Sequence, residues 1–314
     1  MATPATSNPQ QQLFESAVDA LNALFGSHPG FRAVHAKGVL CEGTFTPSMD
    51  AASLSRAPHF QTTVPVTVRF SDFTGIPNIP DTDPNANPRG LAIRFHLLNG
   101  SDADIVAHSF NGFPVGNVEE FVGFLHAVAA TKPDSPKPTP IEVFLSTRPN
   151  ALKFAMGTMS MPVPTSFSAL SYFAINAFKF TNSDGVMRHA RYQIHPATNA
   201  APTTAAGTSQ RSPDFLFDEL RDRLAKGFFE FKLVAQLAQD GDPIDNGSLT
   251  WPDDRPQIEL GTIKLSTVMG DSDAAQRRLI FDPAHLADGI ELSTDPLPAA
   301  RSAVYSISYA RRNP

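Results

Sequence analysis

The sequence predicts an α+β fold, with an antiparallel β-sheet or β-barrel at the centre and helices around it. Three observations support this class. Runs of alternating apolar residues indicate strands, stretches near both ends have the apolar spacing of helices, and a hairpin turn joins two strand-like runs. The 314 residues, 41% of them hydrophobic, suffice for a large packed core. Because no internal repeat or low-complexity linker is present, we expect a single domain over residues 11–314, after a flexible arm at residues 1–10.

One helix followed by three strands is predicted for the first third of the chain. Apolar residues recur at helical spacing over residues 11–25. Strands are expected at residues 38–46, 64–70 and 90–98, with a loop rich in Pro, Asp and Asn before the last of them. In the second strand, valines alternate with less apolar residues, which predicts a half-buried strand with Arg69 on the face opposite the valines.

Helices and strands are predicted to alternate in the rest of the chain. The helices are expected at residues 118–130, 140–156, 215–227 and 298–312. The strands are expected at residues 172–181, 185–194, 228–238 and 259–265. Between the first two of these strands, the segment Asn182-Ser183-Asp184-Gly185 favours a tight hairpin turn. Pro298 falls in the first turn of the last helix, a position that tolerates proline.

Composition argues against several classes of function. A net charge of −6 and a pI of about 5.8 do not provide the basic face that nucleic-acid binding needs. The histidines do not cluster at metal-ligand spacing, and the Gly-x-Ser-x-Gly, P-loop, His-Glu-x-x-His and Cys-x-x-Cys-His motifs are missing from the sequence. Asp81 and Asp83 stand in a proline-rich loop, where a solvated turn is expected rather than a calcium site.

The cysteine content and the N-terminal sequence indicate the cellular compartment in which the protein is expected. Cys41 is the single cysteine, so no internal disulfide can form and an oxidising compartment is not indicated. The polar start MATPATSNPQQQ lacks the features of a secretory signal, and no apolar run is long enough to span a membrane. We expect a cytoplasmic protein, while a periplasmic chain from which a signal was removed stays open.

Two polar residues in or near the predicted strands could take part in catalysis or ligand binding. His35 could act as an acid or base near neutral pH, although surface or hydrogen-bonded core histidines are more common. Arg69 lies in an apolar strand, where burial is costly unless the guanidinium meets an anion. That anion could be Asp72, another acid or a ligand.

The last predicted helix combines an arginine and a tyrosine. Arg301 and Tyr305 are at i and i+4 and therefore share a face, with Arg312 near the same face two turns on. A neighbouring guanidinium favours the phenolate form of a tyrosine, and a ferric ion bound to it would do so further. The spacing thus suits an iron-ligating tyrosinate, while a surface tyrosine stacked on an arginine is the more common situation.

Together, these segments resemble the haem catalase family, most closely its short members, the catalase-related peroxidases. FRAVHAKGVLCEGTF resembles the distal-histidine signature of the family, and VTVRFSDFTG followed by NPRGLAIRFH resembles its strand pair. SFNGFPV and FVGFLHA follow in order, and FDPAHLADGIELSTDPLPAARSAVYSISYARR resembles the proximal signature. The resemblance implies a catalase-like haem domain, with an antiparallel β-barrel core, that lacks the family's C-terminal helical extension.

The resemblance also implies a haem b cofactor and a role for each matching residue. His35 would move the peroxide proton, Ser71 would hydrogen-bond the distal histidine, and Asn111 matches the distal asparagine. Tyr305 would ligate the iron. Residues expected to support the haem are Arg32, Arg69 and Arg312 at the propionates, Phe121 against the haem face, and Arg301 beside the phenolate.

By the same resemblance, peroxide loses a proton to His35 and regains it on the leaving oxygen, while Asn111 donates a hydrogen bond to the developing charge. Full-sized catalases have a long arm and a helical extension that bury the haem, whereas few residues follow Tyr305 in this sequence. A wider entrance would admit bulky peroxides and organic donors. We therefore predict a peroxidase that uses a peroxide and a small organic electron donor, with weak catalase activity.

Two other functions stay open at this point. Related haem domains rearrange fatty-acid hydroperoxides with the same distal and proximal residues, and a non-enzymatic haem-binding or sensing module could share the fold. His35 and Asn111 argue against a carrier, which needs neither of them. A homodimer is expected, with a monomer as the alternative, and no nucleic-acid partner is expected.

Overall fold

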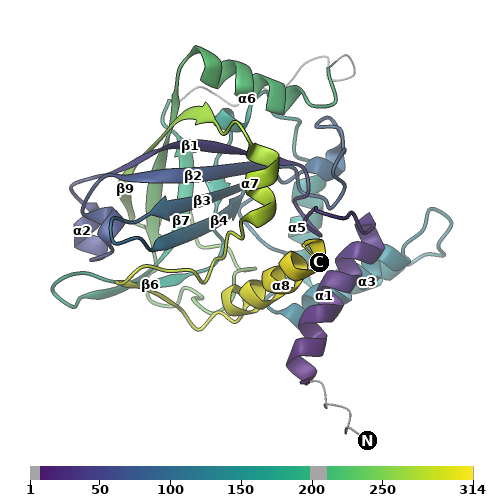
Figure 1. Cartoon of the computed structure of the whole chain (residues 1–314). Helices are drawn as coiled ribbons and strands as arrows, with labels where there is room; N and C mark the ends of the chain where they lie inside the picture. Colours follow the sequence, from purple (N-terminus) through teal and green to yellow (C-terminus); the bar gives the residue numbers. More distant parts are fainter. Residues whose placement is uncertain (1–7, 199–210, 314) are drawn as a thin grey trace, which may run out of the picture.

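The computed structural model describes residues 8–198 and 211–313. Helices surround a central set of strands (Figure 1). The helices are α1 (Pro9–Phe25), α2 (Ala51–Leu54), α3 (Val118–Ala130), α4 (Pro140–Ser146), α5 (Pro149–Met159), α6 (Phe215–Lys226), α7 (Ser272–Arg278) and α8 (Leu297–Arg312). The strands are β1 (Gly38–Pro47), β2 (Val64–Ser71), β3 (Gly90–His96), β4 (Asp102–His108), β5 (Tyr172–Phe173), β6 (Phe178–Thr181), β7 (Met187–Pro196), β8 (Phe229–Leu237), β9 (Gln257–Val268) and β10 (Ile290–Leu292). Short 3₁₀ helices lie at Pro58–Phe60, Pro84–Ala86 and Phe167–Ala169.

The strands close into an antiparallel barrel, which confirms the predicted fold class. Neighbours around the barrel follow the order β7-β5-β4-β3-β2-β1-β9-β8, and β8 pairs back with β7. Strands β6 and β10 extend the sheet outward from β7. At the β1–β9 pairing the register shifts between Glu42 and Gly43, where a Cβ on Gly43 would lie 2.0 Å from the carbonyl oxygen of Lys264. Glycine is required at this close approach of two backbones.

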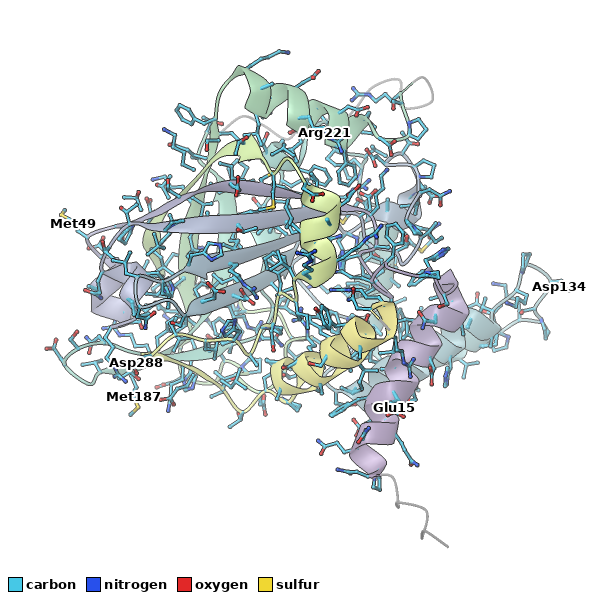
Figure 2. All side chains as sticks on the ribbon, viewed as in Figure 1. Glu15, Met49, Asp134, Met187, Arg221 and Asp288 are labelled. Atoms are coloured by element: carbon cyan, nitrogen blue, oxygen red, sulfur yellow. The ribbon has the colours of Figure 1, made fainter. Side chains whose placement is uncertain are left out.

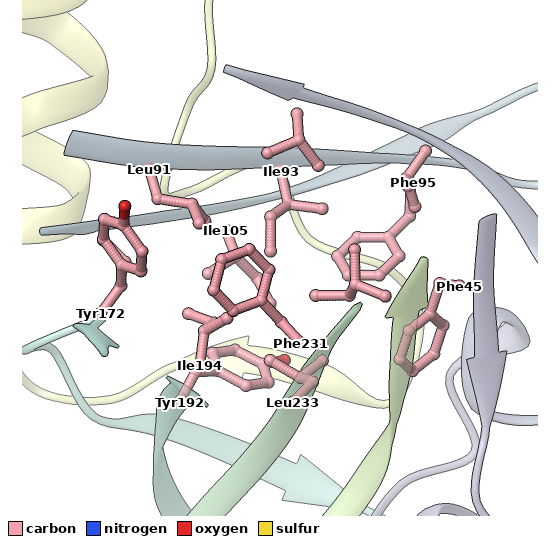
Figure 3. Packing of buried hydrophobic residues seen from close by; sticks show 14 of the residues in the cluster. Phe45, Leu91, Ile93, Phe95, Ile105, Tyr172, Tyr192, Ile194, Phe231 and Leu233 are labelled. Carbon is pink, nitrogen blue, oxygen red and sulfur yellow. The ribbon is translucent and has the colours of Figure 1, made fainter. Parts of the chain in front are cut away.

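The barrel interior holds the main apolar core, part of which is drawn in Figure 3. Along β3, Leu91, Ile93 and Phe95 are at most 1% exposed and point inward, as the two-residue period of a strand dictates. Burying each such side chain contributes about 1.5–3 kcal/mol to folding. The phenol of Tyr172 is also fully buried, and it donates a hydrogen bond to the carbonyl oxygen of Phe167 at 2.8 Å.

The second face of β2 is more buried than the sequence pattern predicted. Arg69 does lie on the face opposite the valines, but Thr67, Arg69 and Ser71 are all at most 6% exposed. The half-buried strand was therefore wrong for this part of the chain. Helix α7 covers the outer face of the strand, since Gln276 Oε1 accepts a hydrogen bond from Arg69 Nε at 3.0 Å.

Helices α1, α3 and α8 form a layer beside the barrel (Figure 1). A small apolar cluster joins them, with Ala17 of α1, Val118 of α3, and Leu297 and Ala300 of α8. This cluster is separate from the core inside the barrel. The space between the helical layer and the outer face of β2, β3 and β4 is where the candidate site lies.

Several elements differ from the sequence predictions. The strand expected at residues 172–181 is two short strands, β5 and β6, and α2 and β10 were not predicted. β4 was missed because Asp102 and Asp104 interrupt its apolar pattern, although Arg94 of β3 neutralises Asp104 at 2.7 Å. The helix predicted at residues 140–156 is two helices, because Pro149 cannot continue a helix and starts α5 instead. α7 was missed because it is short and polar.

Helix α1 begins two residues earlier than predicted. The side chain of Asn8 accepts a hydrogen bond from the backbone N–H of Gln10 at 3.0 Å, and Pro9 occupies the first turn. Residues 9 and 10 of the expected arm thus belong to the helix. Residues 1–7 of that arm lie outside the described residues.

Helix α6 packs on the barrel with an apolar face inward and charged residues outward. Its apolar face, including Leu216 and Leu220, is fully buried. Asp218, Arg221 and Arg223 are exposed, and Figure 2 shows Arg221 at the periphery of the molecule. Among the described helices, none has the length and apolar content needed to cross a membrane.

One histidine is buried in the barrel core and makes folding sensitive to acid. His59 is 1% exposed, its ring stacks on Phe95 with centroids 4.6 Å apart, and burial lowers its pKa from 6.5 to about 3. The unfolded chain therefore takes up a proton below pH 6.5, while the folded protein does not until about pH 3. Folded stability must fall as the pH drops through this window.

We expect His59→Phe to reduce this acid sensitivity. Between pH 7 and pH 5, the variant should lose about 2 kcal/mol less of its free energy of unfolding than the wild type. Urea unfolding at the two pH values measures the difference, and comparing each protein with itself removes the packing cost of the substitution. An identical pH dependence for both proteins would contradict the prediction.

Candidate functional site

A cavity of about 740 Å³, including its mouth, lies between the helical layer and the barrel. Its walls are largely apolar, with Val18 and Leu21 from α1, Val106 from β4 and Val304 from α8. Six of the predicted site residues line it: Arg32, His35, Arg69, Ser71, Tyr305 and Arg312.

His35 enters the cavity from a constrained backbone position. Its φ of 56° is in the left-handed region, which costs a non-glycine residue on the order of 1 kcal/mol, and its backbone N–H donates to the carbonyl oxygen of Phe73 at 2.8 Å. Its ring Nδ1 lies 3.0 Å from the carbonyl oxygen of Asp72 and 3.1 Å from Ser71 Oγ. Because a carbonyl oxygen can only accept, Nδ1 carries the proton and Nε2 is left with a free lone pair.

The surroundings keep His35 neutral. Burial, the positive charge of Arg69 and the proximity of His108 lower its pKa from 6.5 to about 3. A neutral imidazole with an unprotonated Nε2 can accept a proton throughout the physiological range. The site therefore provides a buried base of fixed tautomer.

Gly90 is what allows the His35 ring to approach the barrel. A Cβ at this position would lie 2.4 Å from Ser71 Oγ and 2.7 Å from His35 Nδ1. Gly90 pairs with Ser71 across β2 and β3, so any side chain there would project toward the imidazole. This glycine was not identified as a site residue from the sequence.

A buried ion-pair network lies directly behind His35. Arg89, which is fully buried, contacts the carboxylate of Asp72 and donates to the carbonyl oxygen of Asp81 at 2.5 Å. Lys37 reaches Asp81 at 2.5 Å, and Asp81 also accepts from the backbone N–H of Leu216 at the start of α6 at 2.7 Å. The network therefore ties the His35 segment, the end of β2 and α6 together.

Three arginines converge on one part of the cavity without an acidic partner. Arg32 donates to the carbonyl oxygens of Gln276 and Leu279 at 3.0 and 2.9 Å, Arg69 donates to the Gln276 side chain, and Arg312 donates to Leu279 at 2.8 Å. Within residues 8–198 and 211–313, none of the three forms an ion pair with a carboxylate.

Their unpaired charges make the site suited to an anion. Burial lowers the pKa of Arg312 to about 10, and burial together with the charge of Arg312 lowers the pKa of Arg69 to about 9. Burial and these two cations also lower the pKa of Arg32. Arg312 Nε is enclosed without a hydrogen-bond partner among the described residues. Buried cations of this kind are costly unless a bound anion compensates them.

Tyr305 is held by the arginine that the sequence placed beside it. Arg301 Nε and Nη2 donate to the phenol oxygen at 3.1 and 3.0 Å, and Arg301 Nη1 donates to Asn176 Oδ1 at 2.9 Å. Asn176 in turn donates to Asp295, which also accepts from the backbone N–H of Leu297 at the start of α8. Two guanidinium donors on one oxygen stabilise negative charge on it.

Three predicted residues lie outside the cavity lining. Asn111 is in the loop after β4, is partly exposed and makes no side-chain hydrogen bond to the rest of the described chain. Phe121 in α3 stacks on Phe113 with centroids 5.8 Å apart and packs with Leu21 behind the cavity wall. Arg301 also lies outside the lining and acts through Tyr305.

Other residues of the site were missed because no local signal marks them. Asn176 follows a two-residue strand and Gln276 lies in a short polar helix, so only the folded chain reveals their contacts with Arg301 and Arg69. His108 ends the strand that the sequence pattern did not predict. Gly90 could have been suspected from its place at the start of a strand directly after a loop.

The donor set fits haem. Tyrosine is a known haem-iron ligand, the three arginines can bind two carboxylates, and apolar side chains line the rest of the cavity. A buried base stands in the same cavity. This barrel and this site define an oxidoreductase of the haem peroxidase class.

Comparisons with known proteins identify the family. The sequence model of the catalase family matches residues 29–313, so the chain belongs to the catalase family. Catalase-related peroxidases of Synechococcus elongatus and Mycolicibacterium paratuberculosis are each 33% identical to it, over 95% of this chain and 88% and 94% of theirs. A crystal structure of a fungal catalase has the same fold, with a TM-score of 0.78 at 20% identity, over 91% of this chain and 60% of that one.

Gly90→Ala should displace the His35 ring. Because the added Cβ would meet His35 Nδ1 and Ser71 Oγ, the imidazole must move from its hydrogen bond to Asp72. We expect peroxide turnover to fall about 100-fold, the range that a positioned acid–base group supplies, with haem uptake retained. Gly227→Ala is the control, since its Cβ meets no atom within 4 Å. Equal turnover of the Gly90 and Gly227 variants would contradict the prediction.

Arg312→Gln should weaken haem binding without harming the apoprotein. Losing one charge-assisted contact should raise the dissociation constant for haem about 10- to 100-fold. The free energy of unfolding of the apoprotein should stay within about 1 kcal/mol of wild type, because a buried unpaired charge is removed along with one hydrogen bond. Haem titration and urea unfolding measure the two quantities.

The matched control is Arg311→Gln, one residue earlier in α8. Arg311 is exposed and pairs with Asp19 of α1 at 2.6 Å, away from the cavity. Its variant should bind haem like the wild type. If both variants lost haem affinity equally, the cavity arginines would not be the anion site.

Proposed function

We propose that this protein is a haem b-dependent peroxidase that reduces hydrogen peroxide or organic peroxides with an organic electron donor and has weak catalase activity. The observation that carries the proposal is the meeting of a neutral buried His35 with the Arg301–Tyr305 pair in one arginine-lined cavity. The two relatives named catalase-related peroxidases support peroxidase over catalase activity.

The proposed cofactor would be held from two sides. Tyr305 would ligate the iron, with Arg301 stabilising its phenolate, and Arg32, Arg69 and Arg312 would bind the propionates. When bound, haem supplies the redox chemistry of peroxide reduction. The apolar walls of the cavity are compatible with this arrangement, and the contact of Phe121 with the haem face stays a prediction from the sequence.

His35 would move the proton of the substrate. Its Nε2 would take a proton from one peroxide oxygen and return it to the leaving oxygen, so that an alcohol or water departs. Asp72 and Ser71 keep the ring in the tautomer that this transfer needs. The role of Asn111 as a hydrogen-bond donor stays a prediction from the sequence, since it makes no contact in the cavity lining.

Haem loading, spectra and product analysis test the proposal together. The haem-loaded protein should oxidise a phenolic donor with hydrogen peroxide and convert a lipid hydroperoxide to its alcohol. Tyr305→Phe should lose the absorption spectrum of a five-coordinate ferric tyrosinate haem. His35→Ala should keep that spectrum but lose turnover about 100-fold or more.

Three results would contradict the proposal. The first is the absence of any haem band after haem feeding. The second is rapid disproportionation of hydrogen peroxide with no oxidation of an organic donor. The third is an epoxide or aldehyde product from the lipid hydroperoxide, which would indicate rearrangement.

A further inference from the structure

A second histidine faces the same region as His35. His108 ends β4 and pairs directly with Gly90, which pairs in turn with Ser71. Residues paired across antiparallel strands project from the same face of the sheet. Because Ser71 contacts the His35 ring and a Cβ on Gly90 would also touch it, His108 projects from that face one strand further along.

The backbone after β4 favours one tautomer of the neutral His108 ring. The N–H of Phe110 donates to His108 Nδ1 at 3.4 Å, so Nδ1 is unprotonated and the proton of the neutral ring is on Nε2. Burial and the charge of Arg301 lower the pKa of His108 from 6.5 to about 3, so the ring stays neutral. The ring lies nearly parallel to that of Phe113, with centroids 6.4 Å apart.

The Nε2–H group of His108 meets no acceptor in the described part of the chain. Nε2 is enclosed and has no hydrogen-bond partner among residues 8–198 and 211–313. Leaving a buried donor unpaired costs about 1–3 kcal/mol, so such a group is unusual and needs an explanation. A ligand that enters the cavity and offers an acceptor would remove this cost.

The two histidines are complementary. His35 donates through Nδ1 to the Asp72 carbonyl and keeps an acceptor at Nε2. His108 accepts at Nδ1 and keeps a donor at Nε2. One acceptor and one donor are what a peroxide needs, because one of its oxygens gives up a proton and gains negative charge as it does so.

We propose that His108 contacts the substrate and that its Nε2–H donates a hydrogen bond to the peroxide oxygen that gives its proton to His35. The inference rests on the proposed peroxidase function and adds a residue to it. His108 keeps its own proton throughout, and only the hydrogen bond shortens as charge develops. Neither His108 nor Asn111 is part of the cavity wall itself, but Asn111 is in the partly exposed loop after β4, whereas His108 pairs with Gly90 and its Nε2 is enclosed and unpaired among the described residues.

Fluoride binding to the haem-loaded full chain tests the donor without turnover, since a small anion in the distal space needs the same hydrogen bond. The proteins compared are wild type, His108→Phe, His108→Gln and Asn111→Ala. Phenylalanine keeps the ring and the packing on Phe113 but has no N–H, while glutamine restores a donor. Haem content and circular dichroism establish that each variant is folded.

We expect His108→Phe to raise the fluoride dissociation constant about tenfold, as loss of one hydrogen bond to an anion predicts, and to lower kcat/KM for peroxide similarly. His108→Gln should recover most of both, and Asn111→Ala should change the fluoride affinity less than His108→Phe does. ¹⁵N spectra of the apoprotein should show His108 protonated at Nε2 only, from pH 7 to pH 5.

The outcomes separate this inference from the function on which it rests. Unchanged fluoride affinity in a folded, haem-loaded His108→Phe protein would overturn the role of His108 alone. So would a tenfold loss in Asn111→Ala but not in His108→Phe, or a His108 ring protonated at Nδ1. Failure of the wild type to take up haem would overturn the proposed function and this inference together.

Discussion

The buried contact between Asp72 and Arg89 is the interaction on which the distal side of the cavity depends. The two groups are fully buried. Removing Asp72 would leave Arg89 without a carboxylate partner among the described residues, at a cost of about 3–5 kcal/mol, whereas Asp72 also faces Lys37 at 3.7 Å. The pair holds Asp72 in place directly after β2. The backbone carbonyl oxygen of Asp72 accepts a hydrogen bond from His35 Nδ1–H. The buried Asp72–Arg89 pair thus sets the tautomer of the His35 imidazole, which itself stays neutral.

The arginines at the proposed ligand site differ from Arg89, because carboxylates of the described residues do not neutralise them. Arg69 and Arg312 are buried and Arg32 is partly buried, and none of the three meets a carboxylate within the part of the chain that the structure describes, although Arg89 and Arg94 pair with Asp72 and Asp104. The protein therefore neutralises its structural arginines and leaves the cavity arginines available. That difference costs stability in the apoprotein and directs an anion to one end of the cavity. It also explains why Arg69 could not be assigned from its strand alone.

Features that depend on residues close together in the sequence could be predicted, whereas contacts between distant parts of the chain could not. The alternating residues of β1 to β3 and the i, i+4 spacing of Arg301 and Tyr305 are local patterns, and the structure contains both the strands and the contact. Asn176 reaches Arg301 across 125 positions of the chain, and no periodicity encodes such a contact. β4 was hidden because Asp104, paired with Arg94, made a buried strand appear polar.

The two distal histidines show why residue type alone could not define the chemistry. Both are partly buried, and desolvation lowers the pKa of both to about 3, but the backbone groups that face Nδ1 differ. A carbonyl oxygen faces Nδ1 of His35, whereas a backbone N–H faces Nδ1 of His108. The first contact leaves an acceptor on the free nitrogen and the second leaves a donor. Reversing either contact would give two acceptors or two donors, and such a pair could not take a proton from a peroxide while holding the charge left behind.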